Sequence, residues 1–242
     1  MTRRVALFRA QDAAAVTAGR LSQLGFSAIC APVIETVARP FSPKRTDYDA
    51  IVATSANAFV ADAPVERSAR VYVVGARTAR AAEARGWRLA APPAREVQQL
   101  VQTLMRDIAP GAHALYIAGR DRKARLEDEL GAVASLETVE AYAAEARAAW
   151  RPAEIREIAA SSAALHYSPR SAALAARLAE AAGILTSFAA MRHVCLSSAA
   201  AAPLGTVGAQ AIFIAATPDE PALFDALRQA MVIFPSDRPY RI

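Results

Sequence analysis

Polar residues and glycines follow short apolar runs at several points along the chain, in positions where they could bind an anionic ligand. In residues 71–87, VYVVGARTARAAEARGW, four apolar residues precede Gly75, and an alanine-rich segment with Thr78 follows and ends at Gly86. This pattern predicts a buried parallel strand that turns into a helix. Gly75 would allow the backbone to approach a ligand, and Thr78 would cap the helix or present its hydroxyl outward. Because free N–H groups at a helix start attract anions, this turn is a candidate anion site.

Similar turns elsewhere supply the other candidate substrate-binding residues. Arg9 ends the first apolar run, and the later turns contribute Thr54, Ser55, Ala56, Gly119, Ser168, Arg170, Ser197 and Ser198. In open α/β sheets ligands bind where strands end and helices begin, so these residues are predicted to bind the substrate. Each has a structural alternative. Thr78 and Ser168 would act only as helix caps, Arg9 would pair with a neighbouring acid, and Arg170 would lie on the surface.

The elements that must position these turns alternate between strands and helices. Strands are predicted at 5–8, 28–37, 48–53, 71–74, 89–91, 114–118, 135–144, 163–167, 194–196 and 211–215, and helices at 13–24, 97–108, 122–131, 152–160 and 172–182. Pro32 interrupts the second strand, which predicts an edge or crossing segment. Thr217 is expected to cap the last helix in a capping box with Glu220. The alternation predicts an α/β fold built on parallel sheets.

A weak internal repeat of ~110 residues suggests two related halves. VALFRAQD resembles ALYIAGRD, and IVATSANA resembles ALHYSPRSA, each before a helix. The repeat predicts two similar lobes with a cleft between them, each a parallel sheet flanked by helices, joined by a two-stranded crossing connection. We expect residues 1–36 and 146–242 to form a discontinuous first lobe and residues 37–145 to form the second. The tail from Ile233 is predicted to be a loose extension.

Composition and charge narrow the classes of partner. The formal net charge is +5, but the sequence has no run of five or six like charges, so nucleic acid is not an expected partner. The arginine excess suits a small polyanion instead. Cys30 and Cys195 lie in apolar runs and are predicted to be buried thiols in a reducing compartment. With neither a signal-peptide pattern nor an apolar stretch of about 18 residues, the chain is expected to be cytoplasmic and not membrane-associated.

The order of the segments resembles that of the uroporphyrinogen-III synthase family over nearly the whole chain. The matching segments are VALFRA, the proline in the strand after the first helix, ATSANAF, VYVVGARTARAAEARGW, ALYIAGR, VEAY, HYSPRSA and AIFIAATPDEPALFDAL. The strongest part is VVGARTA with the later Gly86-Trp87. The resemblance implies a two-lobed, monomeric lyase without cofactor or metal. It would dehydrate and cyclise hydroxymethylbilane, a linear tetrapyrrole with eight carboxylates, and invert the last pyrrole ring to give uroporphyrinogen III.

The resemblance also implies a catalytic residue. Tyr142 in VEAY matches the family tyrosine proposed to donate the proton to the leaving group, although a tyrosine there could equally be a core aromatic. The linear substrate cyclises unaided to the uninverted isomer, so the enzyme must act mainly by orientation, holding the substrate folded. The carboxylates of the substrate would be held by N–H groups at helix starts, by Ser and Thr hydroxyls and by arginines.

Two departures from the family pattern leave an alternative open. Ala10 stands where a proline is usual, and Ser197-Ser198-Ala199-Ala200 replaces a second Gly-x-x-Thr turn. A non-catalytic anion- or tetrapyrrole-binding regulatory module of the same fold would tolerate both changes. An exported two-lobed receptor is less favoured because a signal peptide is missing. A flavin or dinucleotide enzyme is less favoured because the GxGxxG and GxxxxGK[ST] motifs are missing.

Overall fold

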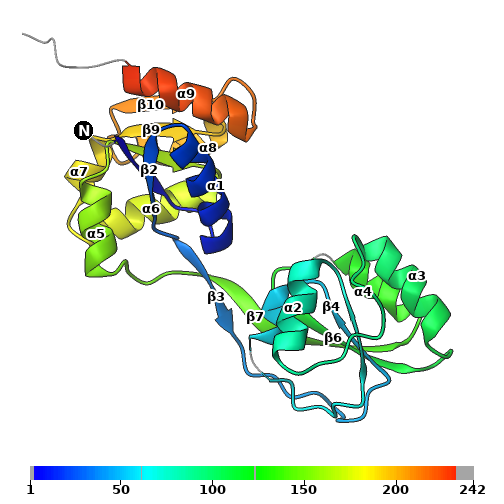
Figure 1. Cartoon of the computed structure of the whole chain (residues 1–242). Helices are drawn as coiled ribbons and strands as arrows, with labels where there is room; N and C mark the ends of the chain where they lie inside the picture. Colours follow the sequence, from blue (N-terminus) through cyan, green and yellow to red (C-terminus); the bar gives the residue numbers. More distant parts are fainter. Residues whose placement is uncertain (1–2, 61, 123, 233–242) are drawn as a thin grey trace, which may run out of the picture. The chain divides into compact units, whose positions relative to one another are not determined.

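The computed structural model describes residues 3–60, 62–122 and 124–232, so the tail predicted from Ile233 lies outside the described residues. The chain divides into two compact units (Figure 1). The first unit contains the chain up to Glu35 and from Ala146 onward, and the second contains Thr36–Glu145. Each unit has its own five-stranded sheet.

The sheet of the first unit is parallel and has the order β10-β9-β8-β1-β2. Its strands are β1 (Arg3–Leu7), β2 (Phe26–Cys30), β8 (Ala163–His166), β9 (Arg192–Cys195) and β10 (Ala211–Ile214). The central strands are short apolar runs that are buried on both faces, as expected for a parallel sheet covered by helices. The prediction of an α/β fold with parallel sheets is therefore confirmed.

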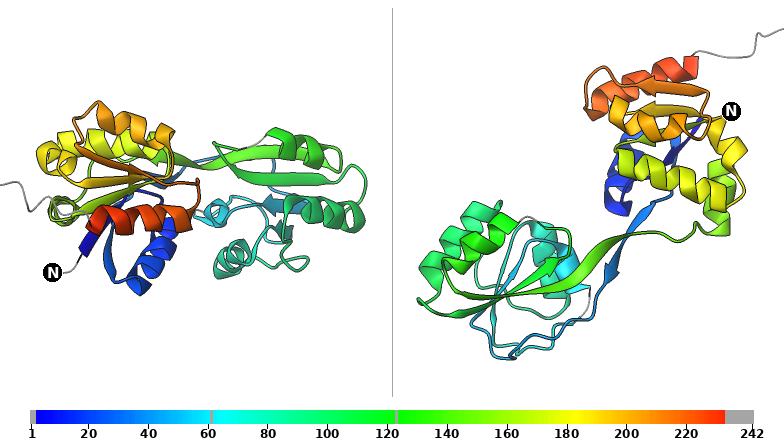
Figure 2. Two further views of the ribbon diagram at one scale, coloured as in Figure 1. Left: turned by 90° about the horizontal axis from the view of Figure 1, so that it is seen from above. Right: turned by 180° about the vertical axis from the view of Figure 1, so that it is seen from behind.

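Helices cover both faces of this first sheet, as Figure 2 shows. The helices α1 (Gln11–Gln23) and α9 (Glu220–Val232) pack on the face that carries Val5 and Leu7. The opposite face carries Ala6, and α5 (Pro152–Ala159), α6 (Pro169–Ala181), α7 (Leu185–Ala189) and α8 (Ser198–Gly205) pack there. Successive strand residues point to opposite faces, so one apolar run supplies both cores.

The second unit repeats this layering on the order β3-β7-β6-β4-β5. Its strands are β3 (Ile34–Ala38), β4 (Ala50–Ala53), β5 (Arg70–Val73), β6 (His113–Gly119) and β7 (Ser135–Ala146), and β5, β4, β6 and β7 are mutually parallel. The 3-10 helix η1 (Ala56–Phe59) and α2 (Ala76–Ala84) cover one face. The helices α3 (Val97–Asp107) and α4 (Ala124–Gly131) cover the other.

Each sheet has one point at which the strand order reverses. In the first unit the chain leaves β1 toward β2 on one side and later leaves β8 toward β9 and β10 on the other side. In the second unit β4 leads to β5 on one side, whereas β6 leads to β7 on the other. The helices that follow then lie on opposite faces, which opens a crevice at the carboxyl ends of the two central strands. The topology therefore predicts a ligand site at the carboxyl ends of β1 and β8 in the first unit, and of β4 and β6 in the second.

Two predicted elements differ in the structure, and one helix was not predicted. The strand expected at 28–37 is two strands, β2 and β3, which belong to different sheets, because residues 31–33 around Pro32 lie in neither ladder. Within the described residues, segment 89–91 forms an isolated bridge to β5 and no full strand, since Pro92 and Pro93 follow at once. The helix α7 was not predicted, because its five residues are too few to show a helical period.

Two predicted helix caps were wrong. The helix α9 begins at Glu220, and its first turn is capped by Asp219, whose Oδ1 accepts the N–H of Ala222 at 2.9 Å, while the Thr217 hydroxyl donates to Asp219 Oδ2 at 2.6 Å. The carboxylate competes successfully with the threonine hydroxyl for the cap position. Thr78 neither caps α2 nor points outward. The helix starts two residues earlier, after Gly75 with φ of 82°, and Thr78 is buried in its first turn.

Other features bear on the predicted environment of the protein. Cys195 is buried, and burial raises the pKa of its thiol to about 12, whereas Cys30 is half-buried. Within the described ranges, no helix has both the length and the apolar character to cross a membrane.

Candidate functional site

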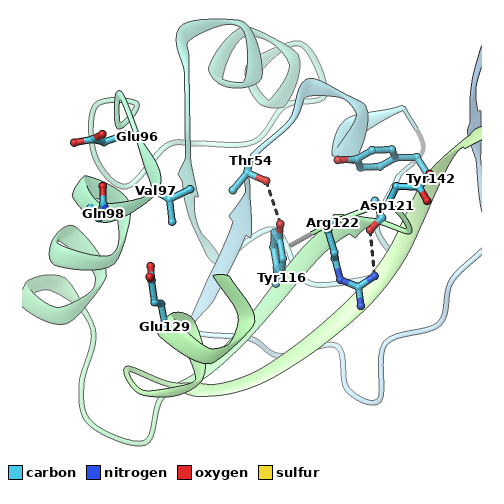
Figure 3. Close-up of a pocket in the computed structure, with 10 residues that line it drawn as sticks. Thr54, Glu96, Val97, Gln98, Tyr116, Asp121, Arg122, Glu129 and Tyr142 are labelled. Atoms are coloured by element: carbon cyan, nitrogen blue, oxygen red, sulfur yellow. Dashed lines mark hydrogen bonds between the residues drawn. The ribbon is translucent and has the colours of Figure 1, made fainter. Parts of the chain in front are cut away.

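The second unit contains a pocket of about 530 Å³ at its point of strand-order reversal (Figure 3). Thr54 follows β4 and Gly119 ends β6, so the pocket opens between the carboxyl ends of these neighbouring strands. The lining residues are Thr54, Glu96, Val97, Gln98, Tyr116, Gly119, Asp121, Arg122, Glu129 and Tyr142. The structure thus brings Thr54 and Gly119, which the strand-end rule selected, together with Tyr142 from within β7.

Two hydroxyl groups form one wall of this pocket. The Thr54 Oγ1 and the Tyr116 hydroxyl lie 3.1 Å apart, and Tyr116 is almost completely buried. Burial raises the pKa of Tyr116, so its hydroxyl stays protonated at neutral pH. The pair therefore offers a neutral hydrogen-bonding wall that can both donate and accept.

Tyr142 reaches the same pocket from β7, and its ring lies directly over Gly119. A Cβ built on Gly119 would lie 2.6 Å from Tyr142 Cε2 and 2.9 Å from Cζ, closer than non-bonded carbons approach. The ladder between β6 and β7 shifts register here, since Ala118 pairs with Glu140 but Gly119 pairs with Tyr142. Irregularities of this kind redirect side chains next to active sites. In Figure 3 the phenol of Tyr142 extends from β7 toward Thr54.

The charged groups of the pocket are not those of an anion site. The Arg122 guanidinium makes hydrogen bonds within the protein. It donates to Glu140 at 2.9 Å, to Glu127 at 3.1 Å and to the carbonyl of Gly119 at 3.1 Å. Hydrogen bonding to Glu140 raises the pKa of Arg122. The wall also carries three carboxylates, from Glu96, Asp121 and Glu129. This pocket is suited to phenol-mediated proton transfer and to positive charge on a ligand.

The first unit has a second pocket, of about 380 Å³, at its own point of strand-order reversal. Arg9 follows β1 and Tyr167 follows β8, and both line it. Arg9 pairs with Glu220 at 3.1 Å, as the structural alternative from the sequence anticipated, and stacks on Tyr167 at 3.9 Å from the ring centre. The Arg9 side chain remains 30% exposed and lines the pocket, so a ligand in the pocket can contact it despite the ion pair.

The remaining predicted residues serve the helix starts and line neither pocket. Ser55 accepts the N–H of Asn57, Ser168 accepts that of Ser171, and Ser197 accepts that of Ala200. These serines are caps, as the structural alternative held for Ser168. Gly75 precedes α2, Ala56 and Ser198 begin η1 and α8, and Arg170 is exposed in the first turn of α6. The structure thus separates the helix-cap positions from the pocket walls.

Several pocket residues were not predicted. Tyr116, Arg122 and Tyr167 line the pockets, and Glu220 was expected only as part of a capping box. Tyr167 had a usable signal, since it stands between an apolar run and Ser168-Pro169, where a strand end is expected. Glu220 had none, because its partners come from distant parts of the chain. Within the part of the chain that the structure describes, no group of three or more His, Cys, Asp or Glu side chains could hold a metal ion.

Comparisons with known proteins assign the family. A family model described as uroporphyrinogen-III synthase HemD matches residues 15–225. Among solved structures, a uroporphyrinogen-III synthetase from Helicobacter pylori is similar, with 12% identity, coverage of 94% of this chain and 99% of that chain, and a TM-score of 0.48. A Thermus thermophilus uroporphyrinogen III synthase gives 15% identity, 95% and 100% coverage and a TM-score of 0.42.

A search of curated proteins found no match to this chain. The family assignment therefore depends on the family model, which spans most of the 242 residues and includes residues of both pockets, among them Tyr142, Thr54 and Tyr167. The chain belongs to the uroporphyrinogen-III synthase family.

Proposed function

We propose that this protein acts on hydroxymethylbilane through the two pockets, dehydrating and cyclising it with inversion of the last pyrrole ring to give uroporphyrinogen III. The observation that carries the proposal is the family-model match over residues 15–225. The protein would work in the cytoplasm as a monomer, without metal or cofactor, on a small-molecule substrate alone. The activity is that of a lyase, because a carbon–oxygen bond breaks and water leaves.

Tyr142 is proposed as the proton donor. Its phenol transfers a proton to the hydroxyl oxygen of the terminal hydroxymethyl group, the carbon–oxygen bond breaks, and the electron pair leaves with water. The pyrrole nitrogen lone pair stabilises the resulting azafulvenium cation. The carboxylates of Glu96, Asp121 and Glu129 on the pocket wall favour that positive charge. Ring closure then releases a ring proton, which returns the phenolate to its neutral form.

The choice of isomer would follow from how the substrate is held. Unaided closure gives the uninverted ring, so the protein must bring the other carbon of the last pyrrole to the cationic centre, a task of orientation. We propose that Arg9, Thr54, Ser55, Ala56, Gly75, Gly119, Ser168, Arg170, Ser197 and Ser198 bind the substrate. Thr78 was predicted with them, but its burial in α2 supports only a structural role.

We further propose that the two units act as two lobes joined by a two-stranded connection. The chain passes from the first unit to the second between Glu35 and Thr36 within β3, and returns between Glu145 and Ala146 at the end of β7. The strands β3 and β7 are neighbours in the second sheet, which supports a paired connection. The non-catalytic alternative is less favoured, because the family model that matches residues 15–225 is that of the synthase.

The test is the isomer composition of the product. Purified protein and freshly prepared hydroxymethylbilane are mixed, and the products are oxidised to porphyrins and separated. We expect type III to dominate, whereas type I alone would refute the proposal. Tyr142→Phe is expected to lower kcat by about 100-fold or more, the usual contribution of a general acid. Tyr72→Phe is the matched control, because the Tyr72 hydroxyl is buried on β5, away from the pocket, and makes no hydrogen bond in the described structure.

A further inference from the structure

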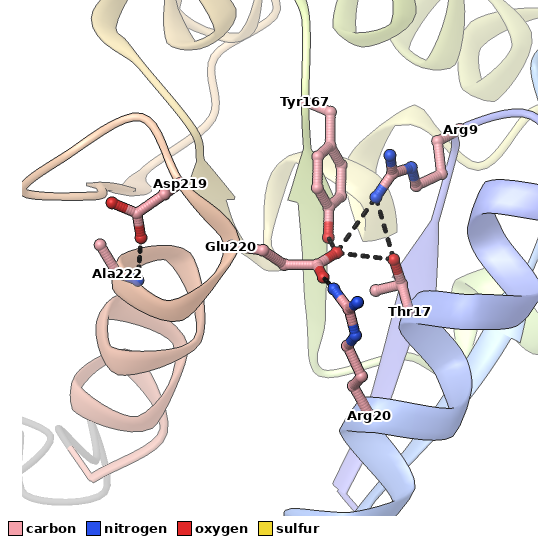
Figure 4. Close-up of polar contacts among 7 residues, drawn as sticks. All are labelled: Arg9, Thr17, Arg20, Tyr167, Asp219, Glu220 and Ala222. Atoms are coloured by element: carbon pink, nitrogen blue, oxygen red, sulfur yellow. Dashed lines mark hydrogen bonds and ion pairs between the residues drawn. The ribbon is translucent and has the colours of Figure 1, made fainter. Parts of the chain in front are cut away.

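Four side chains from three parts of the first unit converge on one carboxylate, that of Glu220, in its pocket (Figure 4). Glu220, at the start of α9, accepts hydrogen bonds from the Thr17 and Tyr167 hydroxyls, each at 2.7 Å, and from Arg9 Nη1 at 3.1 Å. Arg20 Nη1 donates to its second oxygen. The Glu220 side chain is 14% exposed, so these contacts hold it firmly.

Both hydroxyl protons are used by these contacts. Thr17 donates to Glu220 and accepts from Arg9 Nη1 at 3.0 Å, and Tyr167 donates to Glu220. Burial raises the pKa of Tyr167, so its hydroxyl remains a donor at neutral pH. Burial works to raise the pKa of Glu220, but the hydrogen bonds from Tyr167, Thr17 and Arg20 lower it overall, so Glu220 stays ionised.

The two guanidinium groups, by contrast, are only partly used. Arg9 and Arg20 each donate to Glu220 through Nη1. No hydrogen bond from Nε or Nη2 of either arginine is found among the residues that the structure describes. The Nε–Nη2 edge of arginine is a planar pair of donors that matches the two oxygens of a carboxylate. The Arg9 and Arg20 side chains are 30% and 57% exposed and both line the pocket, so a ligand in the pocket can reach part of each side chain.

Two guanidinium groups face one carboxylate in this cluster. Asp219 also lines the pocket and balances the remaining positive charge, but its oxygens are turned to the Thr217 hydroxyl and to the N–H of Ala222 at the start of α9. The preference for a carboxylate therefore depends on the arginine edges and not on the net charge of the pocket. A ligand carboxylate would therefore meet two preformed arginine edges in a partly enclosed site.

We propose that this cluster is a subsite for one carboxylate side chain of the tetrapyrrole, and that Glu220 is a positioning residue that fixes Arg9 and Arg20 with their free edges toward the ligand. The proposal deepens the proposed function, on which it depends for the identity of the ligand. The task assigned to the first unit is to hold one carboxylate of the ligand.

The test compares three variants in binding and in steady-state kinetics. The binding probe is uroporphyrin III, the stable oxidised form of the product, followed by its fluorescence. Glu220→Gln removes the charge that orients both arginines, and Arg20→Lys keeps the charge but removes the planar edge. We expect each to raise the Kd for uroporphyrin III and the KM for hydroxymethylbilane by about 10-fold, with kcat within about 2-fold, which is roughly one bidentate contact. Arg156→Lys, on the exposed part of α5 on the opposite face of the sheet, is the control and should leave both constants unchanged.

A purely structural role for Glu220 would lower the melting temperature without changing KM relative to kcat, and that result would overturn the proposal. An unchanged Kd in Glu220→Gln or in Arg20→Lys would do the same. Tighter binding by Glu220→Gln would also overturn it, because Glu220 would then be a competitor for the arginines. If wild-type protein binds uroporphyrin III through this cluster but yields only the type I isomer, the proposed function fails while the subsite stands.

Discussion

Replacing Gly119 by alanine should lower activity by displacing a ring that the alanine would touch. The new Cβ would lie 2.6 Å from Tyr142 Cε2 and 2.9 Å from Cζ. Carbon atoms in contact lie ~3.5–4.0 Å apart, so the ring must move by about 1 Å. Gly119 has no positive φ, so its backbone accepts alanine without strain, and the ring contact is the main consequence. A displacement of ~1 Å at a reacting group can cost about 100-fold in rate.

The assay measures kcat, isomer ratio and thermal stability for Gly119→Ala. We expect kcat to fall by 10- to 100-fold and stability by about 1–3 kcal/mol, the cost of overpacking. Gly131→Ala in the same unit is the matched control, because a Cβ there would meet nothing within 4 Å. Its kcat should equal that of wild type.

A double-mutant cycle then tests whether the effect passes through Tyr142. In a Tyr142→Phe background there is no proton donor left to misplace, so Gly119→Ala should cause little further loss of kcat. A full loss in that background would refute the reasoning, as would a wild-type kcat for Gly119→Ala alone.

Two further predictions concern the stability of the first unit. His166 Nε2 and His193 Nδ1 lie 3.0 Å apart in the core of this unit. Burial lowers the pKa of His166 well below its usual value and lowers the pKa of His193 to about 4. Below pH 6.5 the unfolded chain therefore binds more protons than the folded protein. The free energy of unfolding should therefore fall as the pH drops from 6.5 toward 4, by about 3 kcal/mol from His193 alone. Denaturant unfolding that shows no pH dependence between 6.5 and 5 would contradict this. Glu154, 8% exposed, binds Arg147 through both oxygens at 3.0 Å. Glu154→Gln should cost about 3 kcal/mol at pH 7 with kcat unchanged, because the buried Arg147 loses its partner; wild-type stability in urea would refute that expectation.

The layered fold could be predicted because its signals are local. Short apolar runs such as 163–166 and 71–73 are buried on both faces of their sheets, and this is the property that separates parallel strands from amphipathic ones. The predictions of secondary structure were wrong where a local sequence pattern was compatible with two different structures. Pro32 was consistent with one interrupted strand or with two strands in different sheets, and only the long-range pairing decides between them.

Some of the pocket-lining residues could be predicted for a related reason. The rule that ligands bind at strand ends selected Thr54, Gly119 and Arg9, which line the pockets, because the carboxyl end of a strand is visible in the sequence. The same rule also selected Ser55 and Ser197, which cap helices, since a cap and a ligand contact use the same residue types. Glu220 could not be found, because its partners at positions 9, 17, 20 and 167 are distant in the sequence.

The measurement that tests the account most directly is amide hydrogen exchange with and without bound uroporphyrin III. We propose that the tetrapyrrole binds at the carboxyl ends of the strands in each unit. We predict slower exchange at residues 9–13 and 167–171 in the first unit and at 54–57 and 119–122 in the second. Protection confined to the opposite ends of the strands, such as residues 45–49 and 66–70, would contradict the claim.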